Sequence, residues 1–305
     1  MVTVVKIGGA RAVDPAGALA DVASLVDSSA EGTSAGSQNA ARSGDGEQVV
    51  VVHGGSTAVD DTLESLGEDP EYVETPSGVV GRFTDERTME VFSMVLPGKL
   101  NTDLVVGLQN AGVNAVGLSG VDGGLLKGPR KSAVRVVEDD KQKIRRGDHS
   151  GTVKQVDSDL LDTLLAGGYT PVVTVPMLAK DSEQWLAVNS DADRAAAAVA
   201  GALDADLVLL TDVPGVLADL DDPDSVIDVV DTPTEYESLT DAAEGFMTRK
   251  VMAATEALEG GATSVTIGDA NADAPVSAAL EGTGTTVLPG ALSEERDTET
   301  AEAEQ

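Results

Sequence analysis

The sequence predicts an α/β protein, a three-layer αβα sandwich with a mostly parallel central sheet. Short apolar runs rich in valine recur along the 305 residues, and stretches with helical spacing separate them. Strands and helices that alternate in this way form parallel sheets covered on both faces. A hydrophobic content of 41% supplies a sizeable core, and 24% charged residues are typical of globular domains.

Six apolar runs are predicted as strands because β-branched residues dominate most of them and each is only four or five residues long. They are Val2–Val5, Val49–Val52, Ala115–Leu118, Pro171–Val175, Leu207–Leu210 and Ser264–Ile267. The stretches between them repeat apolar residues every three or four positions and are predicted as helices. These are Ala16–Leu25, Thr57–Leu66, Thr84–Asn110, Asp157–Ala166, Ala192–Leu203 and Arg249–Glu259.

Two segments fall outside this alternation. Residues 27–48 are mostly Ser, Gly, Ala and Asp, with little to bury, and are predicted as a flexible surface insert. Residues 294–305 are predicted as a disordered acidic tail. The remaining chain is expected to form an N-terminal lobe, 1–200, and a C-terminal lobe, 201–293.

The composition limits the classes of function. The net charge of −33 and the 2% aromatic content are typical of a halophilic protein, and the acidic residues are spread along the chain rather than gathered for one basic partner. The absence of cysteine excludes disulfides, thiolate catalysis and cysteine-ligated metals. The N-terminus shows no leader pattern and no apolar run approaches the roughly 20 residues of a membrane helix, so we expect a cytoplasmic protein without membrane contact.

Two glycine-rich turns follow predicted strands, at Lys6-Ile7-Gly8-Gly9 and His53-Gly54-Gly55-Ser56. Backbone N–H groups in such turns can approach phosphate oxygens without obstruction by side chains. Either turn alone is common in α/β proteins, and a Walker-type phosphate loop is absent. Three further segments complete the pattern: Arg82-Phe83-Thr84-Asp85, Asn189-Ser190-Asp191-Ala192-Asp193-Arg194 and Gly245-Phe246-Met247-Thr248-Arg249-Lys250. Together the five segments predict a site that moves a phosphoryl group onto a carboxylate.

On these motifs the chain resembles the amino acid kinase family, and within it the acetylglutamate kinase branch. The similarity runs from Lys6 to Gly284, and is strongest to kinases whose substrate is glutamate or 2-aminoadipate linked to an amino-group carrier protein of the LysW type. The resemblance implies the amino acid kinase fold, with the acyl substrate in the N-terminal lobe and the nucleotide in the C-terminal lobe. It also implies ATP-dependent formation of an acyl phosphate in lysine or arginine biosynthesis.

The resemblance assigns roles to individual residues. Lys6 and Lys250 match the two lysines that offset negative charge in the transition state, and Asp193 matches the aspartate that holds them. Arg82 matches an arginine that pairs with the substrate carboxylate in a bidentate fork, and Asn189 contacts the substrate's α-side. The substrate-binding turn comprises Gly54, Gly55 and Ser56, where Ser56 departs from the family's third glycine. Nucleotide binding is assigned to Gly8, Gly9, Thr211, Asp212, Gly215 and Met247.

ATP with Mg²⁺ is the implied cofactor pair. The metal would sit mainly on the phosphates, so no residue is predicted as a dedicated metal ligand. His53 and His149 are the only histidines and are too few for a histidine metal site. The residues alone also allow a structural role for Asp191, because aspartate readily caps a helix that begins at Ala192.

Eight of the 20 basic residues fall in the segment 127–146: Lys127, Arg130, Lys131, Arg135, Lys141, Lys143, Arg145 and Arg146. In so acidic a chain, this concentration favours docking of an acidic carrier protein over a small acetylated substrate. Two alternatives stay open for the segment, a solvated β-hairpin without a partner and a nucleic-acid site. The latter is disfavoured because no aromatic residues are interleaved for stacking.

Two alternative functions accompany the carrier-linked reading. The runner-up is an acetylglutamate kinase of arginine biosynthesis. The second is a catalytically silent amino-acid sensor, which Lys6, Asp193 and Lys250 argue against because a sensor needs no such pair of cations. A homodimer is expected by resemblance.

Overall fold

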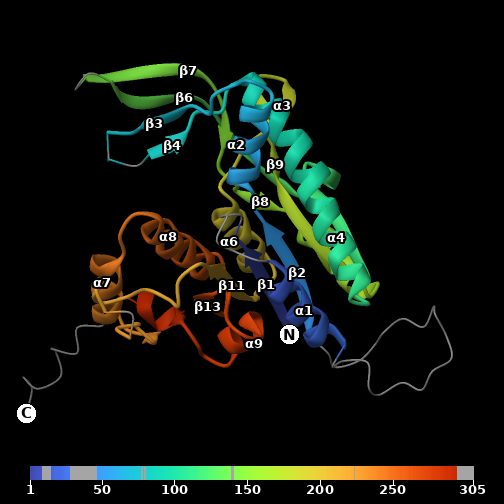
Figure 1. The fold of residues 1–305 in the computed structure, drawn as a ribbon, viewed down its shortest axis with the longest axis vertical. Helices are drawn as coiled ribbons and strands as arrows, with labels where there is room; N and C mark the ends of the chain where they lie inside the picture. The colour runs from blue at the N-terminus through green and yellow to red at the C-terminus, as the bar shows by residue number, and fades with distance from the viewer. Residues whose placement is uncertain are drawn as a thin grey trace, which may run out of the picture.

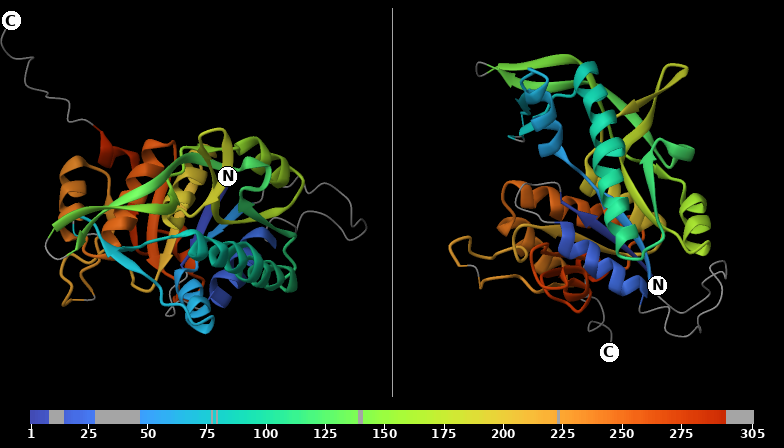
Figure 2. Two further views of the ribbon diagram at one scale, coloured as in Figure 1. Left: turned by 90° about the horizontal axis from the view of Figure 1, so that it is seen from above. Right: turned by 45° about the vertical axis from the view of Figure 1, so that its right-hand side comes forward.

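The computed structural model describes residues 1–8, 15–27, 47–76, 78, 80–138, 141–222 and 224–293. These residues form a large mixed sheet with helices on both of its faces (Figures 1 and 2). The α/β class and the three-layer sandwich predicted from the sequence are therefore confirmed. The predicted insert falls almost wholly, and the predicted tail entirely, outside the described residues, as does Gly9.

The centre of the sheet is parallel, in the order β13-β11-β1-β2-β9-β5. Within it, Lys6 of β1 pairs in register with Leu209 of β11 on one side and with Val52 of β2 on the other. All six predicted strands are present here: β1 (Val2–Ile7), β2 (Gln48–His53), β5 (Ala115–Gly120), β9 (Thr170–Asp181), β11 (Asp206–Thr211) and β13 (Ser264–Asp269).

The polar strands at the edges of the sheet lie outside the six predicted strands, although a β-hairpin was one alternative for residues 127–146. β6 and β7 form a long antiparallel hairpin that begins beside β9 and projects beyond the sheet (Figure 1). A separate two-stranded hairpin, β3–β4, lies beside it. The strands beyond the six predicted ones are β3 (Tyr72–Glu74), β4 (Val80–Arg82), β6 (Leu126–Glu138), β7 (Lys141–Gly151), β8 (Gln155–Val156), β10 (Gln184–Val188), β12 (Val229–Val230) and β14 (Thr285–Val287).

Helices cover both faces of the sheet and close two cores of buried aliphatic residues. On one face lie α1 (Pro15–Asp27), α4 (Asn101–Asn110) and α9 (Pro275–Leu280), and on the other α5 (Ser158–Ala166), α6 (Ala192–Ala202) and α8 (Phe246–Glu259). The six predicted helices are all present, and they include α2 (Ser56–Ser65), α3 (Glu86–Met94) and the π-helix η1 (Val95–Leu100). The helix α9, the helix α7 (Pro233–Ala242) and the short 3-10 turns η2 (Asp122–Gly124) and η3 (Pro289–Leu292) were not predicted.

The predicted helix 84–110 is one continuous stretch in which η1 joins α3 to α4. The wider π turn lies around Pro97, which has no N–H for the regular hydrogen-bond pattern. By length and composition this stretch, Glu86–Asn110, is the one candidate membrane span in the described part of the chain. Charged residues divide its sequence, and Val91, Leu96 and Leu108 are buried in the cores, so we interpret it as a core helix.

Candidate active site

A cleft of about 670 Å³ lies beyond the carboxyl ends of the parallel strands β1, β2 and β11. Open α/β sheets commonly bind ligands at this edge. Eleven of the fourteen residues predicted for the site line the cleft: Lys6, Gly8, Gly54, Gly55, Ser56, Arg82, Asn189, Asp193, Thr211, Asp212 and Lys250.

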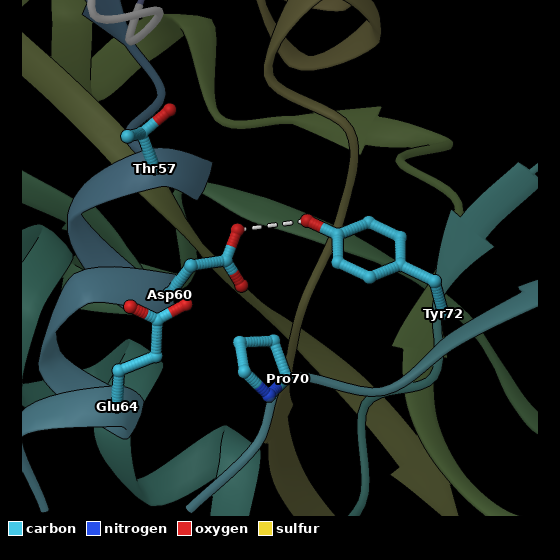
Figure 3. A pocket seen from close by; sticks show the side chains of 5 residues that line it. All are labelled: Thr57, Asp60, Glu64, Pro70 and Tyr72. Atoms are coloured by element: carbon cyan, nitrogen blue, oxygen red, sulfur yellow. Dashed lines mark hydrogen bonds between the residues drawn. The ribbon is translucent and has the colours of Figure 1, made fainter.

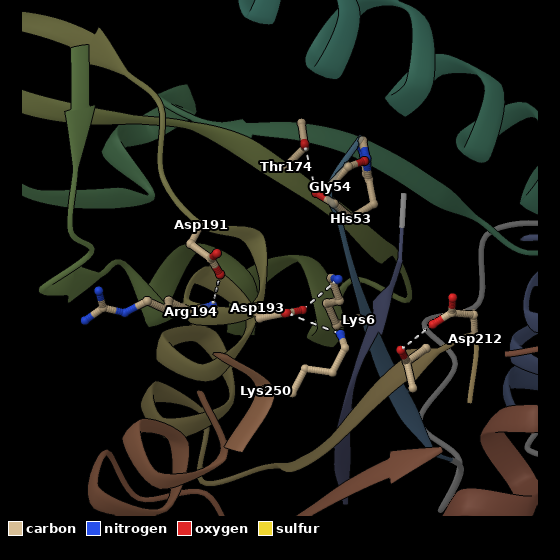
Figure 4. Close-up of polar contacts among 10 residues, drawn as sticks. Lys6, His53, Gly54, Thr174, Asp191, Asp193, Arg194, Asp212 and Lys250 are labelled. Carbon is tan, nitrogen blue, oxygen red and sulfur yellow. Dashed lines mark hydrogen bonds and ion pairs between the residues drawn. The ribbon is translucent and has the colours of Figure 1, made fainter. Parts of the chain in front are cut away.

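Lys6 and Lys250 converge on the carboxylate of Asp193 (Figure 4). The Nζ atom of Lys6 lies 2.6 Å from Oδ1 of Asp193, and the Nζ atom of Lys250 lies 3.3 Å from Oδ2. Lys6 comes from strand β1, Asp193 from the first turn of α6 and Lys250 from the second turn of α8. The structure therefore assembles the lysine–aspartate–lysine group from three elements that are distant in sequence.

All three side chains are nearly buried, with exposed fractions of 8% to 13%. Burial is the largest influence on Asp193 and opposes its ionisation, but the two ammonium groups outweigh it and lower the pKa of Asp193 to about 2. Burial, followed by the charge of Lys6, lowers the pKa of Lys250. The carboxylate of Asp193 opposes that shift, so its charge favours the protonated form of Lys250.

The second glycine turn fits closely under the long helix. A Cβ atom on Gly55 would lie 2.2 Å from Cδ1 of Leu100 and 2.8 Å from Cδ2 of Leu96, so a larger residue there would force these leucine side chains to shift. His53 precedes the turn and its Nδ1 lies 3.0 Å from the carbonyl oxygen of Gly54. Burial lowers the pKa of His53 to about 4, and the nearby charge of Lys6 adds to this. His53 is therefore a neutral residue that braces the turn.

Arg82 is held in place largely through one nitrogen. Its Nη2 donates to the carbonyl of Ser56 at 2.9 Å and to the hydroxyl of Tyr72 at 3.0 Å, and lies 2.6 Å from Oδ1 of Asp60. The guanidinium carbon lies 5.2 Å from the centroid of the Phe92 ring and 5.5 Å from that of Tyr72. The Nε and Nη1 atoms of Arg82 are buried without a hydrogen-bond partner.

This arrangement bears on the bidentate fork expected for Arg82. Each planar edge of a guanidinium that can grip both oxygens of a carboxylate includes Nη2. Because Ser56, Tyr72 and Asp60 already share the two hydrogens of Nη2, a two-point contact with substrate requires one of them to yield. The fork therefore stays a prediction.

Asn189 lies where β7 meets the loop before α6. Its backbone N–H donates to the carbonyl of His149 at 2.8 Å, and its carbonyl accepts from Gly151 at the same distance. The side-chain Nδ2 is 3.4 Å from the hydroxyl of Thr84. The amide oxygen of Asn189 is thus left for an N–H donor in the cleft.

Three predicted residues do not line the cleft. Gly9 is not described. Gly215 is buried, and its missing side chain leaves space for Thr285, whose hydroxyl accepts the N–H of Val216 at 2.8 Å. Met247 packs against the core.

Of the remaining residues, Asp191 caps α6 by accepting the N–H of Arg194 at 3.1 Å, as its position before the helix suggested (Figure 4).

Sequence reasoning missed several residues around the cleft. Asp60 and Tyr72 hold Arg82, and they also line an adjoining hollow of about 510 Å³, where the Tyr72 hydroxyl donates to Asp60 at 2.8 Å (Figure 3). Phe246 and Arg249 lie on the opposite side, and Arg249 donates to the carbonyl of Val80 across the cleft. Phe246 and Arg249 lie within the quoted segment 245–250 but were given no role there, whereas Asp60 and Tyr72 lie outside all five segments.

A deep cleft at the ends of parallel strands, with two glycine-containing turns and two lysines around one aspartate, defines a phosphoryl-transfer enzyme of α/β type. The sequence model of the amino acid kinase family matches residues 1–269, and the chain belongs to this family. It is therefore a phosphotransferase that uses ATP.

Curated relatives extend along most of the chain. It is 44% identical over 285 residues to the [LysW]-aminoadipate kinase of Deinococcus radiodurans, a match that covers 93% of this chain and 90% of the relative. The protein of the same name from Thermus thermophilus is 41% identical, with 93% and 99% covered. The acetylglutamate kinase of Methanopyrus kandleri is 43% identical, with 78% and 90% covered.

Solved structures share the fold at lower identity. N-acetylglutamate synthase from Neisseria gonorrhoeae superposes with a TM-score of 0.67 at 23% identity, covering 94% of this chain and 59% of the synthase. Carbamate kinase from Giardia lamblia, solved with AMP-PNP, gives a TM-score of 0.62 at 15% identity, covering 94% and 98%. These similarities support the amino acid kinase fold and nothing more specific.

Proposed function

We propose that this enzyme phosphorylates the side-chain carboxylate of 2-aminoadipate or glutamate that is linked to a carrier protein of the LysW type. The product is an acyl phosphate in lysine or arginine biosynthesis. The observation that carries the phosphoryl-transfer part is the convergence of Lys6 and Lys250 on Asp193 in the cleft. The names of two relatives at 41% and 44% identity support the carrier-linked substrate.

In the reaction, an oxygen of the substrate carboxylate attacks the γ-phosphorus of ATP while the bond from that phosphorus to the β,γ-bridging oxygen breaks. The bond electrons leave with ADP. No general base is needed because the attacking carboxylate is already ionised. Lys6 and Lys250 supply positive charge and N–H donors to the phosphoryl group in transit, where such preorganised groups contribute most. Asp193 is a positioning residue that aims both ammonium groups.

The nucleotide would bind in the C-terminal lobe, 201–293. Helix α8 begins at Gly245 without a side-chain cap, so its first N–H groups suit a phosphate, and Lys250 lies on its second turn. Thr211 and Asp212, which follow β11, line the same part of the cleft and would contact the nucleoside. Gly215 and Met247 would act indirectly, by packing. Mg²⁺ would be coordinated mainly by the phosphates, since no cluster of three candidate ligands exists among the described residues.

The acyl substrate would bind in the N-terminal lobe, 1–200. Gly54, Gly55 and Ser56 form its glycine turn, Arg82 faces its carboxylate, and the amide oxygen of Asn189 accepts an N–H. Carrier-linked and acetylated substrates both have an amide N–H on the α-carbon. Asn189 alone therefore does not separate the two classes.

The carrier would dock on the hairpin β6–β7. Three of its eight basic residues already form ion pairs within the chain, namely Arg130 with Asp181, Lys143 with Glu138 and Arg145 with Glu71. The other face of the hairpin presents Arg135 and Arg146 on either side of Ile144, whose side chain is 66% exposed. A mixed basic and apolar strand face suits an acidic protein partner at short range. This matters in molar salt, where the Debye length is about 3 Å.

A hydroxamate assay tests the proposal. The purified protein is supplied in molar salt with MgATP and, in turn, N-acetylglutamate, carrier-linked glutamate and carrier-linked aminoadipate, and hydroxylamine traps the acyl phosphate. We expect product from the carrier-linked substrates. Product from N-acetylglutamate alone would support the acetylglutamate kinase alternative, which the Methanopyrus relative favours. No product from any substrate would support the silent sensor.

Two assignments follow from biosynthetic function and composition. We place the enzyme in the cytoplasm, where ATP and the carrier pathway are found. We attribute the charge of −33 to adaptation to high salt. Both stay proposals.

A further inference from the structure

Asp148 is a buried carboxylate for which the proposed reaction has no use. It lies on β7 near the base of the hairpin and is 1% exposed. Its Oδ1 accepts the backbone N–H of Thr84 at 3.2 Å, and its Oδ2 accepts the hydroxyl of Ser150. None of the ion pairs among the described residues involves this carboxylate. Arg130 instead donates to its backbone carbonyl, at 3.2 and 3.3 Å.

The base of β7 lies between two segments that carry substrate-binding residues. On one side, Thr84, which lies two residues after Arg82, is held twice. Its N–H donates to the Asp148 carboxylate, and its carbonyl accepts the N–H of His149 at 2.7 Å. On the other side, Asn189 exchanges two backbone hydrogen bonds with residues 149 and 151. A displacement of β7 would therefore move both segments.

A series of contacts made by side chains links the same elements. The Asp148 carboxylate fixes the backbone of Thr84, and the hydroxyl of Thr84 lies 3.4 Å from Nδ2 of Asn189. Thr84 itself is fully buried. The orientation of the Asn189 amide thus depends on where Asp148 places Thr84.

We propose that Asp148 is a positioning residue for the acyl-substrate pocket. It fixes the segments of Arg82 and Asn189 against the base of the hairpin on which the carrier is proposed to dock. This inference rests on the proposed function, because it takes Arg82 and Asn189 as substrate-binding residues. It adds a residue that contacts neither substrate nor nucleotide, and it ties the docking hairpin physically to the pocket.

The test compares the steady-state kinetics of wild type, Asp148→Ala and Asp148→Asn with the acyl substrate that wild type uses. Alanine leaves the N–H of the buried Thr84 unpaired and removes the partner of the partly buried Ser150 hydroxyl. We expect KM for the acyl substrate to rise about fivefold or more, since the lower end of the cost of an unsatisfied buried donor corresponds to about fivefold in an equilibrium. We expect kcat and KM for ATP to change less than about twofold. Asparagine keeps an oxygen for Thr84 and should recover KM to within about threefold of wild type.

Asp21 supplies the matched control. It is 6% exposed and accepts the N–H groups of Val276 and Ser277, at 2.7 and 2.8 Å, as well as the hydroxyl of Ser277. Asp21→Ala should lower the melting temperature as Asp148→Ala does, but leave every KM unchanged, because α1 and α9 lie on the face of the sheet that carries no cleft residue named above.

An unchanged KM in folded Asp148→Ala, or a rise that Asp21→Ala reproduces, would overturn the inference. If Asp148→Ala does not fold, Ser150→Ala decides, since it removes one partner of the carboxylate and keeps the charge. We expect this variant to raise KM for the acyl substrate by about twofold to fivefold, and no change would overturn the inference. A wild-type enzyme that phosphorylates none of the three acyl substrates would instead contradict the proposed function.

Discussion

At the scale of residues, the site depends on one carboxylate that serves two cations. Lys6 and Lys250 would repel each other in the nearly buried cleft, and Asp193 lies within 3.3 Å of both. Each lysine approaches a different oxygen of the carboxylate, so the pair is fixed in direction as well as in charge. The group therefore presents two oriented ammonium ions to a transferring phosphoryl group at no cost of rearrangement during the reaction.

Removal of one lysine tests this arrangement. Lys250→Ala should lower kcat at least about 100-fold, by analogy with other lost transition-state donors, while the fold persists. Turnover by the hydroxamate assay and thermal unfolding by circular dichroism measure the two effects. Lys154→Ala, a change at an exposed lysine outside both the cleft and the hairpin, controls for loss of charge. Turnover equal to wild type would remove Lys250 from the mechanism.

The pKa of Asp193 predicts a pH dependence of stability. Its pKa is about 2 in the folded protein against an ordinary value of 3.8, so the ionised form stabilises the fold at any pH above about 4. That contribution is lost as the pH falls from about 4 through 2. The free energy of unfolding, measured with urea between pH 2 and 6, should therefore differ most between wild type and Asp193→Asn at the upper end. A difference that stays constant down to pH 2 would contradict the depressed pKa.

At the scale of elements, the contact between the second glycine turn and the long helix decides how close the acyl pocket lies to the sheet. Gly55→Ala would place a methyl group against Leu100 and Leu96, and such overpacking typically costs about 1–3 kcal/mol. We expect a lower free energy of unfolding in urea and a higher KM for the acyl substrate. Gly17→Ala, in a helix and with open space around it, should be neutral or stabilising. Equal stability of the Gly55→Ala variant and wild type would refute the close contact.

The burial of an element decides whether its sequence reveals it. Five of the six predicted strands are buried on both faces and β5 is partly buried, so their apolar runs were visible, and the helices between them followed from spacing. The hairpins β3–β4 and β6–β7 are edge structures with exposed polar residues, so their sequences contain no continuous apolar run. The short helix α9 starts at Pro275, and Asp21, distant in sequence, accepts two of its first N–H groups.

The same limit applies to the site. Motifs next to strand and helix ends identified eleven cleft residues, because glycine turns and lysines at those ends are recognisable locally. Asp60, Tyr72 and Asp148 act on Arg82 and Thr84 through contacts between distant segments, which no local pattern encodes. The roles of the site residues stay predictions until variants are measured.

At the scale of the whole molecule, the surface carries two opposing features. The net charge of −33 repels any second copy at low salt. The continuous helical stretch Glu86–Asn110, on the outer side of the molecule in Figure 1, exposes Met94 and Val106 by more than half. Exposed apolar residues on a long helix are typical of contact surfaces. Association through this stretch should therefore depend on salt, because screening removes the repulsion and leaves the apolar contact.

We predict a homodimer in molar salt, with a mass about twice the 31.0 kDa of one chain. Light scattering coupled to size exclusion measures this mass across a salt series, and dissociation is expected as the salt falls. Val106→Glu places a charge on the proposed contact and should give a single-chain mass at all salt concentrations. Leu220→Glu, at a site 62% exposed on a loop of the C-terminal lobe, should leave the dimer intact. A single-chain mass for wild type in molar salt would mean that this apolar helix surface faces solvent, and association through it would be refuted.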